Sequence, residues 1–343
     1  MIIVDKEFFC LKSCLFENKF ILLQYQNPQA SRGCSNRGSF YFYNIMSVQY
    51  KKHFSCTSDI VSLLLDRGLV IDDVDFAQRY IDRVGYYRLS GYLYPLLRFP
   101  KEIHSFKSGS KFQNAVNLYR FDKKLRFLIF YEIEKIEILF RSTLSNVVSE
   151  YTGNIFWMTD PSFFVSEERF SRTMTLIDKE LKNSKEEFIL HFKSKYSNPY
   201  PPAWILVEIL PLGVVTRIFE NLADNVLRKK IASRFGLPVP VFTSWMTIVT
   251  LTRNSCCHHS RVWNKENAIC PMIPKKIKGK WIVSKVSPKR IYFDLCIIKW
   301  FVDIVSPHNK MKERLLRLFL NFPMIDIRAM GFPKNWETEP LWM

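Results

Sequence analysis

One long amphipathic segment constrains the fold of this chain more than any other feature of its sequence. Between Phe112 and Tyr151, apolar residues recur at steps of three and four, and Gly153 follows as a helix terminator. The apolar positions are Leu125, Leu128, Ile129, Ile133, Ile136, Phe140, Leu144 and Val147. This period is that of one buried face of an α-helix. The segment therefore predicts a long amphipathic helix, or two helices with a break near Asp122.

Helix signals dominate the rest of the chain as well. Asp75 can cap a helix that runs to about Val84 and ends at Gly85, and another follows through YYRLSGYLYPLL. Further helices are expected at about 167–195, 203–222, 225–235, 239–263, 290–304 and 309–321. Only KKIKGKWIVSKV (275–286) alternates well enough to predict a short basic hairpin. The predicted fold class is therefore mainly α, a helical bundle with additional helices and this hairpin near the C-terminus.

Composition divides the chain into three expected segments. Residues 1–45 have no clear period and end in a polar Gly/Ser/Asn stretch, so they are expected to be a mobile extension or to precede a true start at Met46. Residues 46–274 are expected to form the helical domain. Residues 275–343 are expected to be a basic segment packed on it. With 343 residues, of which 48% are hydrophobic, the chain can bury a large core.

Charge points to a polyanionic partner. The formal net charge is +18, and between Lys265 and Arg317 there are 13 Lys or Arg against four Asp or Glu. Basic surfaces gain free energy by displacing counterions from phosphates, although a basic surface can also serve solubility alone. The candidate RNA contacts are Arg88, which lies among tyrosines, and Lys275, Lys276, Lys278 and Lys280.

Cysteine usage and hydropathy bear on the compartment. The eight cysteines form no regular framework, and no signal with a basic start and an unbroken apolar stretch precedes them, so a reducing cytoplasm is expected. The most apolar run, AWILVEILPLGVV, is interrupted by Glu208 and Pro211 and is too short to cross a bilayer, so no membrane association is expected.

The segment RNSCCHHSRVWN (253–264) carries the strongest chemical signal. If it is helical, a rotation of about 100° per residue places Asn254, His258 and Arg261 on one stripe, with Arg253 able to swing toward them. Trp263 would anchor the opposite face. Imidazole can transfer a proton near neutral pH, and guanidinium can hold phosphate oxygens. The segment therefore predicts a site that brings an imidazole, an amide and two guanidiniums into one small volume.

Other interpretations of this segment remain open or are disfavoured. An Arg followed by His after four to six residues is expected about once by chance in such a chain, and Arg98 with His104 is a second instance. A surface helix with chance polar residues is thus an alternative. A zinc site is disfavoured, because four consecutive residues in CCHH point around a whole helix. Nucleotide-binding glycine motifs and HExxH are absent from the sequence, and no cofactor or metal is expected.

Polar residues elsewhere can support the site. Glu137 and Arg141 lie four residues apart beside the long apolar stripe, either as a surface pair or as a support for Arg253 and His258. Glu208 stands inside an apolar run and needs a partner if it is buried, either a guanidinium of the site or a remote group. Similarly, Arg88 among tyrosines suits either RNA stacking or helix packing.

Five ordered blocks link this chain to a known family: GYYRLSGYLYP, YEIEKIEILFRSTL, PPAWILVEILPLGVVTRIFENL, KIASRFGL and LTRNSCCHHSRVWN. From about Lys51 to Pro274 the sequence resembles the AbiD/AbiF-like abortive-infection proteins of bacteria, within the HEPN superfamily. Leu212 stands where the family often has an aromatic residue, and Cys257 where Ala is usual. Residues 1–45 lie outside the resemblance, and the basic C-terminal segment follows it only loosely.

The resemblance implies an HEPN-like helical bundle over 46–274 and metal-independent RNA cleavage in phage defence. Arg253 would stabilise the phosphorane, His258 would move the proton and Asn254 would orient them, with His259, Arg261, Asn264, Glu137, Arg141 and Glu208 in support. The expected partners are RNA, a second copy of the chain, and an antitoxin or regulatory RNA. The alternative is an RNA-binding or partner-binding module of a defence or toxin–antitoxin system that does not cleave.

Overall fold

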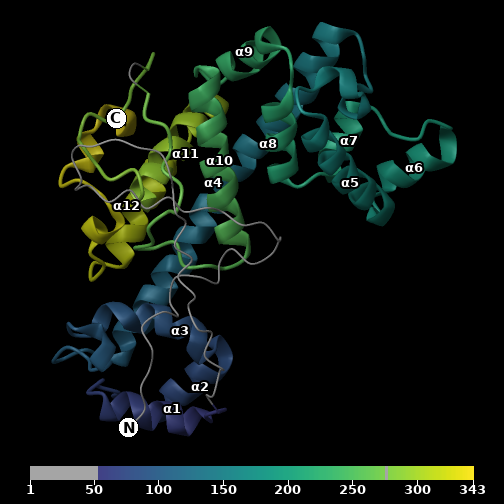
Figure 1. Cartoon of the computed structure of the whole chain (residues 1–343). Helices are drawn as coiled ribbons and strands as arrows, with labels where there is room; N and C mark the ends of the chain where they lie inside the picture. The colour runs from purple at the N-terminus through teal and green to yellow at the C-terminus, as the bar shows by residue number, and fades with distance from the viewer. Residues whose placement is uncertain (1–52, 275–276) are drawn as a thin grey trace, which may run out of the picture. The chain divides into compact units, whose positions relative to one another are not determined.

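The structure is a computed structural model that describes residues 53–274 and 277–343, so the expectation for residues 1–45 lies outside the described part of the chain. Helices dominate, and the described residues include no strand beyond isolated bridges, which confirms the prediction of a mainly α protein. The chain divides into two compact units, an N-terminal unit up to Ala115 and a C-terminal unit from Val116 to Met343. Figure 1 labels the helices.

Three complete α-helices lie in the described part of the N-terminal unit. They are α1 (Thr57–Asp66), α2 (Val74–Val84) and α3 (Tyr86–Leu93). The cap of α2 is Asp73, whose carboxylate accepts a hydrogen bond from the Phe76 N–H at 2.8 Å, rather than the predicted Asp75. Gly85 ends α2 with a φ of 85°, a conformation that favours glycine.

The long predicted helix is a single element, α4 (Phe112–Thr152). At 41 residues it is about 60 Å long, and Ile129, Ile133 and Phe140 on its apolar face are fully buried. The predicted alternative of a break near Asp122 is wrong, because this carboxylate is buried and bonded within an unbroken helix. Gly153 follows α4 with a φ of 67°, as predicted.

Eight further α-helices follow in the described part of the C-terminal unit, and several of them are shorter than the sequence predicted. They are α5 (Glu167–Asn183), α6 (Glu187–Lys195), α7 (Ala203–Ile209), α8 (Leu212–Asn221), α9 (Asn225–Ser233), α10 (Val239–Cys257), α11 (Ile291–Val305) and, last, α12 (Met311–Asn321). The helix predicted at 167–195 is two helices, since the backbone is extended at Ser184 and Glu186. Pro211 divides the one predicted at 203–222, because proline lacks the N–H that would continue the ladder.

Short 3-10 helices complete the fold. They are η1 (Tyr94–Leu96), η2 (Lys101–Ile103), η3 (Trp157–Thr159), η4 (Pro161–Phe163), η5 (Ile327–Met330), η6 (Trp336–Thr338) and η7 (Pro340–Trp342). In the last two, Trp336 and Trp342 are buried with their ring centroids 5.1 Å apart. The C-terminal end of the chain is therefore anchored in the core by aromatic packing.

An aromatic cluster fixes α10 in the core of the C-terminal unit. The Phe242 ring on α10 packs against Phe140 of α4 at 5.6 Å, Phe219 of α8 at 5.0 Å, Phe235 at 4.9 Å and Phe301 of α11 at 6.0 Å, measured between centroids. All five rings are fully buried. Because rings of this size contribute much of the burial energy of a core, the direction of α10 is set well before its C-terminal end.

The predicted basic hairpin at 275–286 is not formed by the described residues of that segment, 277–286. Instead, the Trp281 ring stacks on Trp245 of α10 with centroids 4.8 Å apart. The N–H groups of Val283 and Ser284 donate to the Glu339 carboxylate at 2.7 and 3.2 Å. These backbone donors are satisfied by a side chain, so the segment does not need a strand partner.

Candidate functional site

Arg253 lies on the last turn of α10, where two side chains hold its guanidinium. Its Nε is 3.5 Å from Glu137 Oε2, an ion pair between α10 and α4. Its Nη1 donates to the side-chain oxygen of the neighbouring Asn254 at 3.4 Å. The Arg253 side chain remains 29% exposed, so the guanidinium is oriented by the protein and open to a ligand.

Glu137 is itself held from the other side. Its Oε1 accepts a hydrogen bond from Nη2 of the buried Arg141, and Arg141 Nη1 donates to the backbone carbonyl of Val207 on α7. Arg141 thereby connects α4 to α7 while it neutralises Glu137. One carboxylate between two guanidiniums leaves one excess positive charge beside Asn254, which favours an anion there.

The helix that carries the motif ends at Cys257, so the prediction that it continues to 263 is wrong. The N–H of His259 donates to the Cys256 carbonyl at 3.1 Å, and the N–H of Ser260 donates to the Ser255 carbonyl at 2.9 Å. These two bonds form a Schellman motif, with His259 in the left-handed conformation at φ 55°. The helix therefore ends because His259 takes a backbone conformation that glycine usually adopts.

The two adjacent histidines consequently have different places. His258 is the exposed C-cap residue of α10, and its N–H donates to the Asn254 carbonyl at 2.9 Å, so it stays near Asn254. Arg261 lies beyond the helix end, so it is not on the predicted helical stripe with Asn254 and His258. Trp263 is buried, as the sequence suggested, although it lies after the helix and not on its opposite face.

Two buried residues of α4 fix the segment after the helix, and the sequence analysis missed both. Asp122 Oδ1 accepts hydrogen bonds from the N–H groups of Val262 at 3.2 Å and Trp263 at 2.6 Å. Arg126 pairs with Asp122 and donates to the Ser260 carbonyl at 3.3 Å. The available signal was an acid and a base four residues apart on a strongly apolar helix face, where burial requires a pair.

Asn264, predicted in support of the site, bonds to the C-terminal region. Its side-chain oxygen accepts a hydrogen bond from Arg290 Nη1 at 2.7 Å, and Arg290 Nη2 pairs with Glu266 at 2.9 Å. Asn264 also has a positive φ of 50°, which asparagine tolerates better than most residues. Asn264 therefore connects the end of the motif to the residue that precedes α11.

A buried carboxyl lies behind the motif helix. Asp294 of α11 accepts hydrogen bonds from Thr252 on α10 at 3.2 Å and from the Asn267 side chain at 2.8 and 2.9 Å. Burial raises the pKa of Asp294 to about 7, although both bonds oppose the rise. Burial likewise raises the pKa of the Cys256 thiol to about 12, so this cysteine is not a nucleophile at neutral pH.

Glu208 is exposed on α7, so the expectation of a buried carboxylate that needs a partner is wrong. Because α7 buries Ala203, Leu206 and Val207, position 208 falls on its solvent side. The α7 group that reaches the site network is the Val207 carbonyl.

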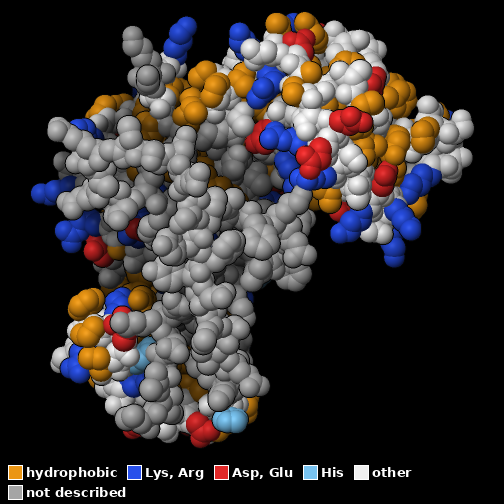
Figure 2. All heavy atoms as spheres, viewed as in Figure 1, with side chains coloured by type: hydrophobic (Ala, Val, Ile, Leu, Met, Phe, Trp, Pro, Cys, Tyr) orange, Lys and Arg blue, Asp and Glu red, His pale blue; other side chains and the backbone are white. Residues whose placement is uncertain are grey.

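The predicted RNA contacts lie apart from this network in sequence. Arg88 is exposed on α3 of the N-terminal unit, and Lys278 and Lys280 are exposed in the segment that follows Pro274. Lys275 and Lys276 lie outside the described residues. On the face shown in Figure 2, described Lys and Arg side chains lie among acidic and hydrophobic ones rather than in one basic patch.

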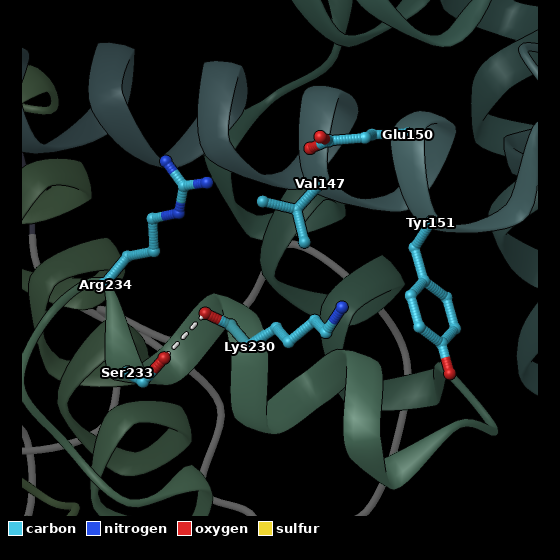
Figure 3. A pocket seen from close by; sticks show the side chains of 6 residues that line it. All are labelled: Val147, Glu150, Tyr151, Lys230, Ser233 and Arg234. Carbon is cyan, nitrogen blue, oxygen red and sulfur yellow. Dashed lines mark hydrogen bonds between the residues drawn. The ribbon is translucent and has the colours of Figure 1, made fainter.

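A surface pocket of about 670 Å³ lies between α4 and α9. Its lining consists of Val147, Glu150, Tyr151, Lys230, Ser233 and Arg234 (Figure 3). Lys230 Nζ is 4.5 Å from the centroid of the Tyr151 ring. Both helices end here, and helix C-termini carry partial negative charge, which offsets the attraction of the two cations for an anion. The pocket shares no residue with the Arg253 network.

Within residues 53–274 and 277–343, no three His, Cys, Asp or Glu side chains are grouped so that they could hold a metal ion. Over the same residues, no helix combines the length and the hydrophobicity that a membrane crossing requires.

The profile of the family described as Abi-like protein matches residues 79–264, more than half of the chain. The chain belongs to the Abi-like protein family. Glu137, Arg141, Arg253 and His258 lie inside the matched region, whereas Asp294 lies outside it. Membership of the Abi-like family indicates a part in abortive infection, a bacterial defence against phage. Neither a curated protein nor a solved structure matches the chain.

Proposed function

We propose that this Abi-like protein is a metal-independent endoribonuclease that acts in the cytoplasm, with an HEPN-like bundle and a site formed by Arg253, Asn254 and His258. The observation that carries the proposal is the Arg253 guanidinium, which Glu137 and Asn254 orient one turn before the exposed His258. An oriented guanidinium can bind phosphate oxygens, and an accessible imidazole can transfer a proton. The five cysteines of the described residues are free, which supports a reducing compartment.

The reaction is an internal transfer within RNA. The 2′-oxygen of the ribose bonds to the adjacent phosphorus while the bond from phosphorus to the 5′-oxygen breaks. His258 accepts the proton of the 2′-hydroxyl, Arg253 stabilises the charge on the phosphorane oxygens, and Asn254 orients Arg253. The leaving 5′-oxygen takes up a proton, so the products carry a 2′,3′-cyclic phosphate and a 5′-hydroxyl. Because the nucleophile belongs to the substrate, no metal-activated water is required.

The second proton-transfer group would come from a second copy of the chain. Each chain offers one His258 next to an oriented arginine, whereas the attacking and leaving oxygens each exchange a proton. A two-fold homodimer in which the ends of two α10 helices face each other would bring two imidazoles to one phosphate. Like charges on Arg253 and its symmetry mate would repel until RNA entered, so RNA would tighten the dimer.

A cleavage assay in EDTA tests the proposal. Purified protein should cleave RNA without metal, His258→Ala should abolish cleavage, and His191→Ala, at an exposed histidine of α6, should not change it. A deoxyribose at the cut position should block the reaction. Strict Mg²⁺ dependence or cleavage of DNA would refute the mechanism, and tight RNA binding without cleavage would identify a non-cleaving module that holds an antitoxin or regulatory RNA.

Subunit mixing tests the shared site. Chains with Arg253→Ala and chains with His258→Ala should be inactive alone. Mixed, they should recover part of the activity, because the shared site of the hybrid holds one Arg253 and one His258, whereas each mutant homodimer lacks one of these groups entirely. A monomer that cleaves RNA at the full rate at every concentration would exclude the dimeric arrangement.

A further inference from the structure

Two phenylalanines of α4 are unusually exposed for their size. The Phe127 side chain is 65% exposed and Phe130 is 41% exposed, although the neighbouring Ile129 and Ile133 on the same helix are fully buried. Exposed rings that lie together on one helix face have an unfavourable contact with water unless a ligand or partner covers them.

Their position along α4 places them beside the candidate site. Arg126 contacts the Ser260 carbonyl just after the end of α10, and Glu137 pairs with Arg253 one turn before that end. Phe130 lies between Arg126 and Glu137 on the same side of the helix, about 6 Å along the axis from Arg126. It is therefore level with the end of α10, where His258 lies. Phe127 lies about 60° further round, toward solvent.

Charge near these rings favours a nucleic acid over a protein segment. Lys123 Nζ lies 6.0 Å from the centroid of the Phe127 ring. Further along α4, Arg141 and Arg253 both pair with Glu137, which leaves one excess positive charge there. Two acidic groups lie on this side of α4: Glu137, which is paired with Arg253, and exposed Glu134, which can accept hydrogen bonds from base amino groups.

Tyr131, one residue beyond Phe130, already has two cations of the chain close to its ring. The Arg314 guanidinium lies 4.2 Å and Lys135 Nζ 4.4 Å from its centroid. Tyr131 remains 45% exposed, but the chain's own cations lie closer to it than Lys123 lies to Phe127, so a ligand meets less competition from these cations at Phe127 and Phe130.

We propose that Phe127 and Phe130 form a stacking surface for unpaired bases of single-stranded RNA whose phosphate lies at Arg253 and His258. The inference rests on the proposed ribonuclease function and adds the substrate class. Aromatic rings bind unpaired bases of any sequence through their π faces, whereas a duplex keeps its bases stacked on each other. Single-stranded RNA is therefore the substrate class, with little dependence on base identity at this position.

The experiment measures binding without cleavage. A fluorescent 2′-fluoro RNA oligonucleotide has no 2′-hydroxyl nucleophile, so fluorescence anisotropy reports affinity whether or not the protein is a nuclease. We expect Phe127→Ala and Phe130→Ala each to raise Kd about fivefold or more. Phe188→Ala on α6, an equally exposed ring at 40% and well apart from α10 in Figure 1, should not change Kd.

Two further measurements separate stacking from charge and from packing. The same oligonucleotide with abasic nucleotides should bind the wild-type protein weakly and should no longer distinguish Phe130→Ala. The salt dependence of binding should be the same in wild type and Phe130→Ala, because no phosphate contact is lost. Phe130→Trp should keep the affinity, whereas Phe130→Leu, apolar but without a π face, should lose it.

The outcomes for this inference and for the proposed function are distinct. If the wild type cleaves RNA and the Phe127→Ala and Phe130→Ala variants bind and cleave it equally well, the stacking surface alone is overturned. Base-dependent binding through both rings without any cleavage would support the stacking surface and overturn the nuclease. If Phe130→Ala dissociates a homodimer in light scattering while the monomer binds RNA normally, the rings form a protein interface and the inference is wrong.

Discussion

Replacing the buried Asp294 with asparagine should stabilise the protein, and the gain should grow with pH. Asp294 is fully enclosed between α10 and α11, and burial raises the pKa of its carboxyl from 3.8 to about 7. A tenfold change in proton affinity corresponds to about 1.4 kcal/mol, so the native state favours the neutral carboxyl by about 4 kcal/mol. Asparagine keeps the shape, can accept the Asn267 hydrogen bond, and never ionises.

The sign follows from proton linkage. Between about pH 4 and about pH 7 the native state holds a proton on Asp294 that the unfolded chain has released, so the contribution of Asp294 to wild-type stability falls as pH rises and then levels off. We expect Asp294→Asn to be similar in stability to the wild type near pH 4 and more stable by up to about 4 kcal/mol near pH 8.

Urea unfolding, followed by circular dichroism at several pH values, measures the difference between the two proteins. Asp303→Asn, on the same helix, is the control: Asp303 is partly exposed and pairs with Lys299, so its effect should stay within about 1 kcal/mol. A difference between Asp294→Asn and wild type that is constant from about pH 4.5 to about pH 8 would refute the assignment of the raised pKa to Asp294.

Three shorter predictions concern the residues around the motif. Asp122→Ala removes the acidic partner of the buried Arg126 and should lower the unfolding free energy by about 3–5 kcal/mol. The control, Glu168→Ala in an exposed ion pair, should lower it by less than about 1 kcal/mol, and equal losses in urea titrations would contradict the prediction. His259→Gly should be more stable than His259→Ala by about 1 kcal/mol, because both lose the imidazole and only glycine suits the positive φ; the reverse order would argue against the Schellman end. Glu137→Gln should stay folded and cleave RNA about tenfold more slowly, since an uncharged partner orients Arg253 less firmly. An unchanged rate would show that Glu137 is not a positioning residue.

The sequence predicted what depends on local periodicity and on terminators. The apolar steps of three and four mark the buried face of α4, and the glycines at 85 and 153 mark the ends of α2 and α4. Both signals lie within short stretches of sequence, so the mainly α fold was predictable. Helix interruptions were less so. The error at Glu208 arose because a nearly continuous apolar run does not show which positions face the core: α7 buries Ala203, Leu206 and Val207 and leaves position 208 on the solvent side.

What the sequence could not predict depends on contacts between distant segments. Asp122 meets the backbone of Val262 and Trp263 about 140 residues later, and no periodicity within either segment shows this. The end of α10 was missed for a different reason, because histidine rarely adopts a positive φ and a rule based on glycine does not find it. The hairpin at 275–286 failed because Glu339, more than fifty residues later, satisfies the backbone donors that a strand partner would bond.

The place of His258 then follows from contacts on both sides of it. Before it, Thr252 is bonded to Asp294 and Arg253 is paired with Glu137; after it, the Ser260 carbonyl accepts a bond from Arg126. Each of these partners is anchored in α4 or α11, so the chain is fixed within a few residues on either side while the imidazole itself stays exposed. A rigid backbone with an accessible side chain suits the proposed transfer of a proton from the 2′-hydroxyl to His258, because a displacement of about 1 Å can cost two orders of magnitude in rate. His259 helps to fix the position of His258 through its backbone: the turn at His259 ends α10 and directs the following residues to Asp122 and Arg126.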